Sequence, residues 1–443
     1  MTSSLDRKIT LSSLLKFAAP TIASTLLMEI YGIIDGLFVA RLIGTDALSA
    51  VNITFPLILV TIAIGMMFGT GGSALVARQL GQKREQTARQ NFSLTVLVAL
   101  AAGILFSVLG LVFLKPLLIF LGADEQLFPY CYEYAYVCLF FMPLALFTGT
   151  FSMFYITRGK AVLGLIFSSI GGITNVVLDY VFIALCDMGL RGAALATGIG
   201  YALAGTIGFI YFSVNRRGSL YFVKPKFKPY VISKICINGS SEMVTNLSVC
   251  LVTILLNNIV IRLAGSDGVA AITVVLYMQT LLMSVCFGYS MGIAPLTSYN
   301  YGKRETPHLQ KIFSISTKMI GTMSVFVFLL CLSQSGKLIG LFVDEDTTVY
   351  KMALRGFKLF AACFLFMGLN IYASALFTAL SNGKVSALLS FCRTFVFVVG
   401  LLLLLPVWWE MTGVWLAIPI AEALSFLMTL FYFRKYKDVY RFA

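Results

Sequence analysis

Charged residues are scarce in this chain. Asp, Glu, Lys and Arg together make up 12% of its 443 residues, whereas hydrophobic residues make up 59%. A soluble fold of this size needs far more polar surface to cover it. The composition therefore excludes an ordinary soluble protein and predicts that the chain lies in a lipid bilayer.

Residues that carry chemistry in many enzymes are also few. The sequence has a single histidine, His308, in a basic loop, which excludes a histidine-ligated metal centre and a His-based catalytic triad. Its nine cysteines are scattered, with no CxxC pair and no histidine nearby, so we predict that they are small core residues. We expect no cofactor, and the N-terminus lacks the pattern of a signal peptide.

Long apolar stretches are abundant, and a helix needs about 20 apolar residues to cross the hydrocarbon. Twelve such stretches lie at about 14–40, 51–77, 91–114, 130–156, 162–185, 191–214, 236–263, 270–298, 313–336, 352–379, 385–407 and 412–434. We predict an all-α integral membrane protein with twelve transmembrane helices.

The chain repeats itself with a displacement of 221 residues. The segment Arg-Leu-Ile-Gly-Thr-Asp that ends at Asp46 returns as Arg-Leu-Ala-Gly-Ser-Asp ending at Asp267, and Gly81 with its basic neighbours returns as Gly302. Six helices per copy is an even number, so both copies enter the bilayer from the same side. The predicted division is an N-terminal six-helix lobe at 1–214, a basic linker at 215–234 and a C-terminal six-helix lobe at 235–443.

The net charge of +14 is unevenly distributed. Most Lys and Arg lie in the tails and the even-numbered connections, whereas acidic residues such as Asp344, Glu345 and Asp346 lie in the odd-numbered ones. Basic loops stay in the cytoplasm, so we predict a multi-pass protein of the plasma (inner) membrane with both termini cytoplasmic. The same distribution argues against nucleic acid as a partner.

A few charged residues interrupt the apolar stretches, where burying a charge costs about 2.5 to 3.5 kcal/mol. These residues are Glu29, Asp35, Asp179, Glu242, Glu422 and Arg393. Glu242 and Arg393 lie nearer helix ends, so they either reach toward water or have a function. Glu422 either pairs with a neighbouring helix or takes part in a cavity, and any lone acid can belong to a polar network that only orders the bundle.

Asn175 and Asp179 are the pair of polar residues in the sequence that most clearly predicts a cation site. They are four residues apart, so a helix presents an amide oxygen and a carboxylate on one face. Such oxygens suit Na⁺, and a desolvated carboxylate also holds a proton. Pro20, in the first predicted helix, removes a backbone hydrogen bond and predicts a hinge or kink.

Pro20, the run from Asp35 to Gly44, the Gly81 loop and the repeat of six helices plus six together resemble the multidrug and toxic compound extrusion (MATE) family over nearly the whole chain. The resemblance is greatest to the DinF/MepA-like branch. It implies a V-shaped pair of six-helix bundles that exports cationic, often aromatic, drugs in exchange for H⁺ or Na⁺ by alternating access.

The resemblance also implies site residues. The branch has a cation site that Asp35, Asn175, Asp179 and Thr197 match, and Glu29, Glu242 and Glu422 are candidates for the substrate cavity. A second cation site in the C-terminal lobe is not expected. Membrane lipids are the other expected partners, and we expect a monomer.

Two other functions fit a membrane protein of this size. A flippase for lipid-linked sugars needs several basic residues in its cavity, and only Arg393 is available. An intramembrane enzyme needs a histidine, an activated serine or paired aspartates near the membrane surface, and the sequence has no such constellation.

Overall fold

The computed structural model describes residues 5, 6 and 8–442, and the chain is helical along most of that length. The first half contains α1 (Leu11–Leu42), α2 (Thr45–Gly81), α3 (Glu85–Val112), α4 (Leu114–Phe120), α5 (Phe128–Thr157), α6 (Ala161–Asp179) with the π-helical turn η1 (Tyr180–Leu185), and α7 (Gly189–Val214). The second half contains α8 (Pro229–Lys303), α9 (Thr306–Ser333), α10 (Ser335–Gly340), α11 (Thr348–Phe360), the 3-10 turn η2 (Ala361–Cys363), α12 (Phe364–Ala379), α13 (Gly383–Phe391), the π-helical turn η3 (Cys392–Val396) and α14 (Phe397–Tyr440).

Ten stretches of the described chain are helical, long and apolar enough to cross a membrane, and two of them contain two crossings each. The 75 residues of α8 would extend about 110 Å if straight, far more than a bilayer. Its backbone departs from helical geometry at Gly265, and that of α14 does so at Glu410. The predicted fold of twelve transmembrane helices is therefore confirmed, although α8 begins at Pro229, before the predicted start of the second lobe.

The internal repeat is visible in the backbone. Lys83 follows α2 and Arg304 follows α8, and both adopt the left-handed conformation, with φ of 59° and 61°. These residues are separated by the same 221 positions as the repeated sequence segments. The two copies therefore end the corresponding helices with the same turn.

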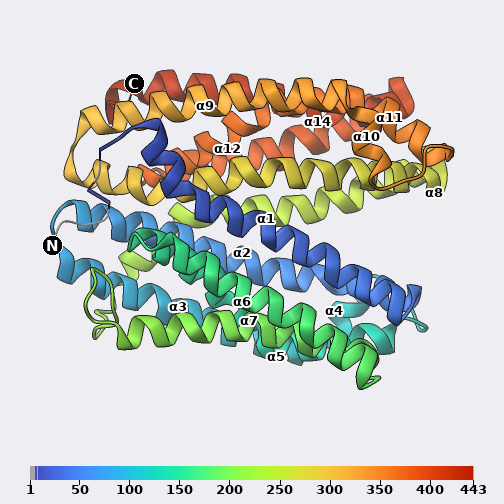
Figure 1. The fold of residues 1–443 in the computed structure, drawn as a ribbon, viewed down its shortest axis with the longest axis horizontal. Helices are drawn as coiled ribbons and strands as arrows, with labels where there is room; N and C mark the ends of the chain where they lie inside the picture. Colours follow the sequence, from blue (N-terminus) through green and yellow to red (C-terminus); the bar gives the residue numbers. More distant parts are fainter. Residues whose placement is uncertain (1–4, 7, 443) are drawn as a thin grey trace.

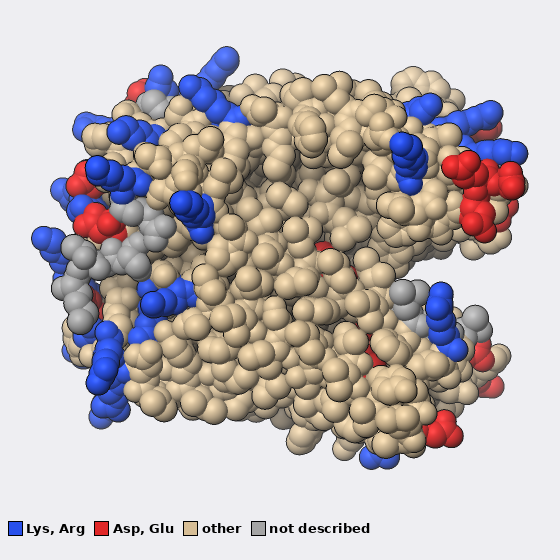
Figure 2. Space-filling model, in the orientation of Figure 1, with Lys and Arg blue, Asp and Glu red and all other residues tan. Residues whose placement is uncertain are grey.

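Basic residues and both chain ends lie at one end of the molecule. Figure 1 shows the start of α1 and the end of α14 at the left, and Figure 2 shows Lys and Arg gathered over the same end. Acidic side chains gather at the opposite end, among other basic ones, and there a deep notch separates the upper and lower parts of the surface (Figure 2). The molecule is thus closed at its basic end and open at the other.

Contacts between α2 and α8 close the basic end. A Cβ at Gly81 would overlap the carbonyl oxygen of Tyr299, and a Cβ at Gly302 would overlap that of Arg78. Glycine lets two helix backbones approach this closely, as it does in many membrane helix pairs. The two lobes are therefore in direct backbone contact at this end.

Helix α1 contacts both lobes. The Oγ of Ser24 lies 2.8 Å from the Oγ of Ser168 in α6, within the first lobe. The next residue, Thr25, donates from its Oγ1 to the carbonyl oxygen of Ser284 in α8, at 3.0 Å. Neighbouring residues of α1 are thus bound to opposite lobes.

Candidate cation site and inter-lobe gate

The four residues of the predicted cation site lie together in the first lobe. Asp179 is the last residue of α6, and Asn175 lies one turn before it. The Nδ2 of Asn175 donates to the Oγ1 of Thr197 in α7 at 3.3 Å. Asp35 of α1 lies within hydrogen-bonding reach of both Asp179 and Asn175. Three helices thus bring two carboxyl groups, an amide and a hydroxyl to one point.

Three of the four carboxyl oxygens of Asp35 and Asp179 have no hydrogen-bond partner among the described residues. Asp179 is fully buried, and neither of its side-chain oxygens has a hydrogen-bond partner among the described residues; the same holds for Oδ1 of Asp35. Two ionised carboxylates only accept hydrogen bonds, so a proton or a cation between them is needed to stabilise their close approach. Hard monovalent and divalent cations prefer such oxygen ligands. The donor set fits a proton or Na⁺.

Two tyrosines that the sequence did not single out lie beside this site. Tyr134 of α5, 2% exposed, is within hydrogen-bonding reach of Thr197, and Tyr201 of α7 is close enough to Asp35 to interact electrostatically. A cavity of about 30 Å³ touches Thr197 and Tyr201 and has room for about two water molecules. Every second residue at the start of α5 is a tyrosine, from Tyr130 to Tyr136. Residues spaced by two do not share a helix face, so the sequence gave no reason to select Tyr134.

The other predicted residues lie apart from this cluster. Glu29 is half-buried in α1, close enough to Tyr201 to interact electrostatically, and Pro20 lies inside a continuous α1. Glu422 is buried in the second lobe, where its Oε1 accepts from the Nε of Arg393 at 3.0 Å. The structure brings together the cation site but not the three candidates for the substrate cavity.

One alternative from the sequence is wrong. Glu242 and Arg393 do not reach toward water at helix ends, because the side chain of Glu242 is 5% exposed and that of Arg393 only 14%. Both side chains turn into the second lobe. For Glu242 the reason is that α8 begins at Pro229, so Glu242 lies well inside the helix and not near its start.

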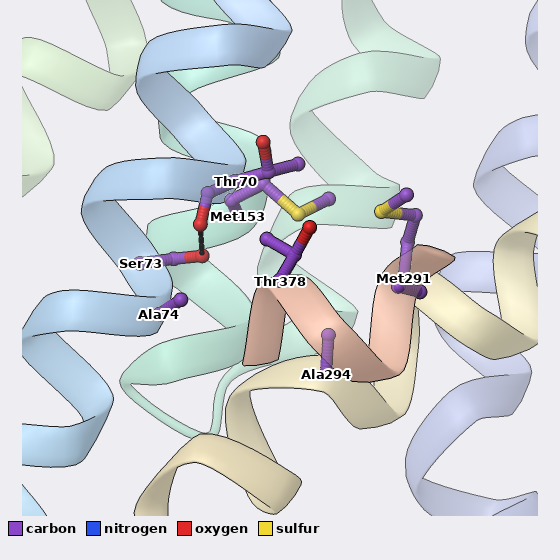
Figure 3. A pocket seen from close by; sticks show the side chains of 8 residues that line it. Thr70, Ser73, Ala74, Met153, Met291, Ala294 and Thr378 are labelled. Carbon is purple, nitrogen blue, oxygen red and sulfur yellow. Dashed lines mark hydrogen bonds between the residues drawn. The ribbon is translucent and has the colours of Figure 1, made fainter. Parts of the chain in front are cut away.

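The space between the lobes is nearly filled at the basic end. Figure 3 shows the side chains around the remaining cavity, which measures about 10 Å³, the space of a single water molecule. Its lining comes from both lobes and includes Thr70, Ser73 and Met153 from the first and Met291 and Thr378 from the second. We call this contact region the gate. Its cavity has no room for a solute larger than a water molecule.

An exposed ionic contact lies next to the gate. The Nζ of Lys303, the last residue of α8, lies 3.2 Å from Asp6 and 3.2 Å from Glu305. Asp6 precedes α1, so this contact connects the N-terminal segment to the second lobe. Exposed pairs of this kind contribute about 0 to 1 kcal/mol each.

Comparisons with a family model, with known sequences and with solved structures all point to the same family. A family model described as MatE matches residues 20–181 and 243–403, more than half of the chain. The chain is 25% identical over 429 residues to the multidrug export protein MepA of Staphylococcus haemolyticus, covering 95% of this chain and 92% of that protein. It is 22% identical to MepA of Staphylococcus aureus, strain MRSA252, over 423 residues, covering 94% and 92%.

Solved structures share the fold. A crystal structure of a MATE protein in complex with MaL6 superposes with a TM-score of 0.94 at 20% identity and covers 100% of both chains. An outward-facing MATE family transporter of the MOP superfamily superposes with a TM-score of 0.92 at 21% identity and covers 99% of both chains. The twelve helices of this chain are therefore arranged as in these proteins.

Proposed function

The chain belongs to the MatE family of transporters, and from this membership we propose that it exports cationic, often aromatic, drugs by antiport with H⁺ or Na⁺. The family consists of transporters and not of enzymes, so the intramembrane enzyme is excluded. The relatives that match over most of the chain are named multidrug export proteins, which supports drugs as the cargo.

One observation carries the proposal: the carboxyl groups of Asp35 and Asp179 approach each other, and three of their four oxygens have no hydrogen-bond partner among the described residues. Such a pair requires a positive particle, so it binds a coupling ion on one side of the membrane and releases it on the other. The ion or proton and the cationic drug compete for the same negative charge. One charge moving through 100 mV supplies about 2.3 kcal/mol, enough for about a fiftyfold drug gradient.

We further propose that the basic end faces the cytoplasm, with both termini there. The notch then opens to the outside and the gate closes the cytoplasmic side, which corresponds to the stage that releases drug and takes up the coupling ion. Alternating access requires the gate to open as the notch closes.

The flippase for lipid-linked sugars is the less favoured alternative. Its pyrophosphate cargo needs several positive charges, whereas Arg393, the base that the sequence offered for such a cavity, already has its Nε bound to Glu422.

Purified protein in liposomes tests the proposal. A pH gradient and a Na⁺ gradient are imposed separately, and transport of ethidium is followed by its fluorescence. We expect one gradient or both to drive ethidium uphill, and added ethidium to dissipate that gradient. If neither gradient moves ethidium, the proposal is wrong, and scrambling of a labelled lipid-linked sugar in the same liposomes would favour the flippase.

A further inference from the structure

The connection between α7 and α8 begins as part of the first lobe. The Nε of Arg89 in α3 donates to the carbonyl oxygen of Ser219 at 3.1 Å, and the backbone N–H of Val223 donates to the Oγ of Ser93, also in α3, at 3.0 Å. Two side chains of α3 thus hold this part of the connection by its backbone. The part that joins the two lobes therefore starts after Val223.

Residues 224–228 form the rest of the connection and have the sequence Lys-Pro-Lys-Phe-Lys. They adopt no regular secondary structure, and α8 begins directly after them at Pro229. All three lysines are exposed, and the ring of Phe227 is 73% exposed. A bulky ring in a lysine-rich segment thus faces the surroundings of the protein and not its core.

Positive charge in this region has no counter-charge beside it. The basic residues of the range 215–234 are Arg216, Arg217, Lys224, Lys226, Lys228 and Lys234, and the range contains no Asp or Glu. Within the described part of the chain, none of these side chains makes an ion pair with a carboxylate. Their charges therefore remain available to an anionic partner.

The connection lies where two helices enter the bilayer. Both α7 and α8 are candidate membrane spans, and the chain leaves the first at Val214 and enters the second at Pro229 (Figure 1). The ring of Tyr230 is 69% exposed, and the Nζ of Lys234, one turn farther, lies 4.7 Å from the ring centre. Ile237, about 10 Å beyond Tyr230 along α8, is an exposed apolar residue. Tyrosine and lysine at this depth are typical of the membrane–water interface.

Anionic phospholipids fit this surface better than a soluble partner does. Retention of a loop in the cytoplasm requires basic residues but gives no reason for exposed rings among them. An acidic protein or a nucleic acid would use the charges and leave Tyr230, at the edge of the bilayer, unexplained. An anionic lipid surface uses both features, because its phosphates attract lysines and its interface buries aromatic rings.

We propose that residues 224–234 form a binding surface for the headgroups of anionic phospholipids in the adjacent leaflet. Lys224, Lys226 and Lys228 bind the phosphates, and Phe227 and Tyr230 lie in the interface. This binding depends on neither the cargo nor the coupling ion of the proposed export function. The same segment is the covalent connection between the lobes, so bound lipid restrains the part of the chain that has to adapt when the lobes rock.

A fluorophore beside the segment tests the proposal. The full-length chain with NBD on Ser233→Cys, an exposed position, in the Cys186→Ser background is purified in dodecyl maltoside and titrated with POPG or with POPC. The labelled chain without Ser233→Cys gives the background signal. We expect POPG to bind at least about tenfold more tightly than POPC, because each lysine near an anionic lipid surface contributes about a fivefold factor.

Three exposed lysines are then neutralised at a time. We expect the combined variant Lys224→Gln, Lys226→Gln and Lys228→Gln to lower the preference for POPG to less than about twofold. The matched control removes the same net charge at the opposite end of the molecule, by Lys337→Gln, Lys351→Gln and Lys358→Gln, and should keep the wild-type preference. An equal loss in the control would show that net charge, and not this segment, selects the lipid, and would overturn the proposal.

Two further titrations examine the headgroup and the ring. Phe227→Ala should weaken POPG and POPC alike, by at least about threefold, because its ring no longer enters the interface. Glycerol 3-phosphate should compete with POPG only weakly. Wild-type protein that binds both lipids equally, or that binds glycerol 3-phosphate as tightly as POPG, overturns the lipid surface. No transport is measured in these titrations, so that result leaves the export proposal intact, and a failure of ethidium transport leaves the lipid surface intact.

Discussion

Gly81 and Gly302 lie on facing helices, and each presses against a backbone carbonyl of the other's helix, at Tyr299 and Arg78 respectively. The partners are related by the same displacement of 221 residues as the glycines themselves. Because the sequence repeats, the same contact between a glycine and a carbonyl occurs twice, once from α2 to α8 and once from α8 to α2. This contact lies at the closed, basic end of the molecule, the end at which the gate also lies.

Gly302→Ala should therefore open the gate. The methyl group overlaps the carbonyl of Arg78, and overpacking of this kind costs about 1–3 kcal/mol, which changes a two-state population about 5- to 150-fold. We expect a cysteine placed in the gate by Ser73→Cys to react with maleimide faster from the basic side, by a factor in that range. Gly321→Ala is the matched control, because no atom lies within 4 Å of its added Cβ. Equal rates in the two backgrounds would contradict a glycine-dependent gate.

Lys303→Gln should have a smaller effect on the same gate. Lys303 is 28% exposed and Asp6 39%, and exposed ion pairs contribute about 0 to 1 kcal/mol. We expect labelling of Ser73→Cys to rise by less than about fivefold. A rise as large as that in Gly302→Ala would mean that the ionic contact, and not the helix packing, keeps the gate closed.

Asp35→Asn and Asp179→Asn should each abolish drug export coupled to a gradient. Either change removes one of the two negative charges of the proposed coupling-ion site, so we expect ethidium export from cells to fall to that of cells without the protein. Glu133→Gln, which alters an exposed carboxylate on α5, is the control and should export like wild type. Normal export by Asp35→Asn at equal expression would remove Asp35 from the site.

Glu422→Leu should destabilise the protein strongly. It leaves Arg393 buried without its partner, and breaking a buried ion pair in this way costs about 3–5 kcal/mol. We expect a clear fall in the midpoint of thermal unfolding in detergent, with Glu133→Leu unfolding like wild type. An unchanged midpoint would show that Arg393 finds another partner when Glu422 is absent.

Cys186 offers a direct test of the orientation. It is exposed in the connection between η1 and α7, away from the basic end. We expect a membrane-impermeant maleimide added to intact cells to label wild-type protein, and Cys186→Ser to lose that label. Labelling of Cys186 only in inverted vesicles would reverse the proposed orientation of both termini.

The sequence predicted the helices better than their contacts. Apolar length and the positions of charged loops define each crossing, which is why the twelve stretches agree with the structure. The pairing of Asn175 with Asp179 followed from helical spacing, but the approach of Asp35 came only from the resemblance. Asp35 and Asp179 are 144 positions apart in the sequence. Their contact depends on how α1 and α6 pack together, which no local sequence pattern predicts. The same reason explains why the sequence left open whether Glu242 and Arg393 reach toward water, an alternative that their burial excludes.

The position of α1 has a mechanical consequence. Ser24 contacts α6 of the first lobe and Thr25 contacts α8 of the second, so two consecutive residues of α1 are bonded to different lobes. In the proposed export cycle, opening of the basic end therefore has to break one of these hydrogen bonds or twist α1 between them. Asp35 lies farther along the same helix. A change in the charge of its carboxylate and a change in the contacts of Ser24 and Thr25 therefore both act on α1.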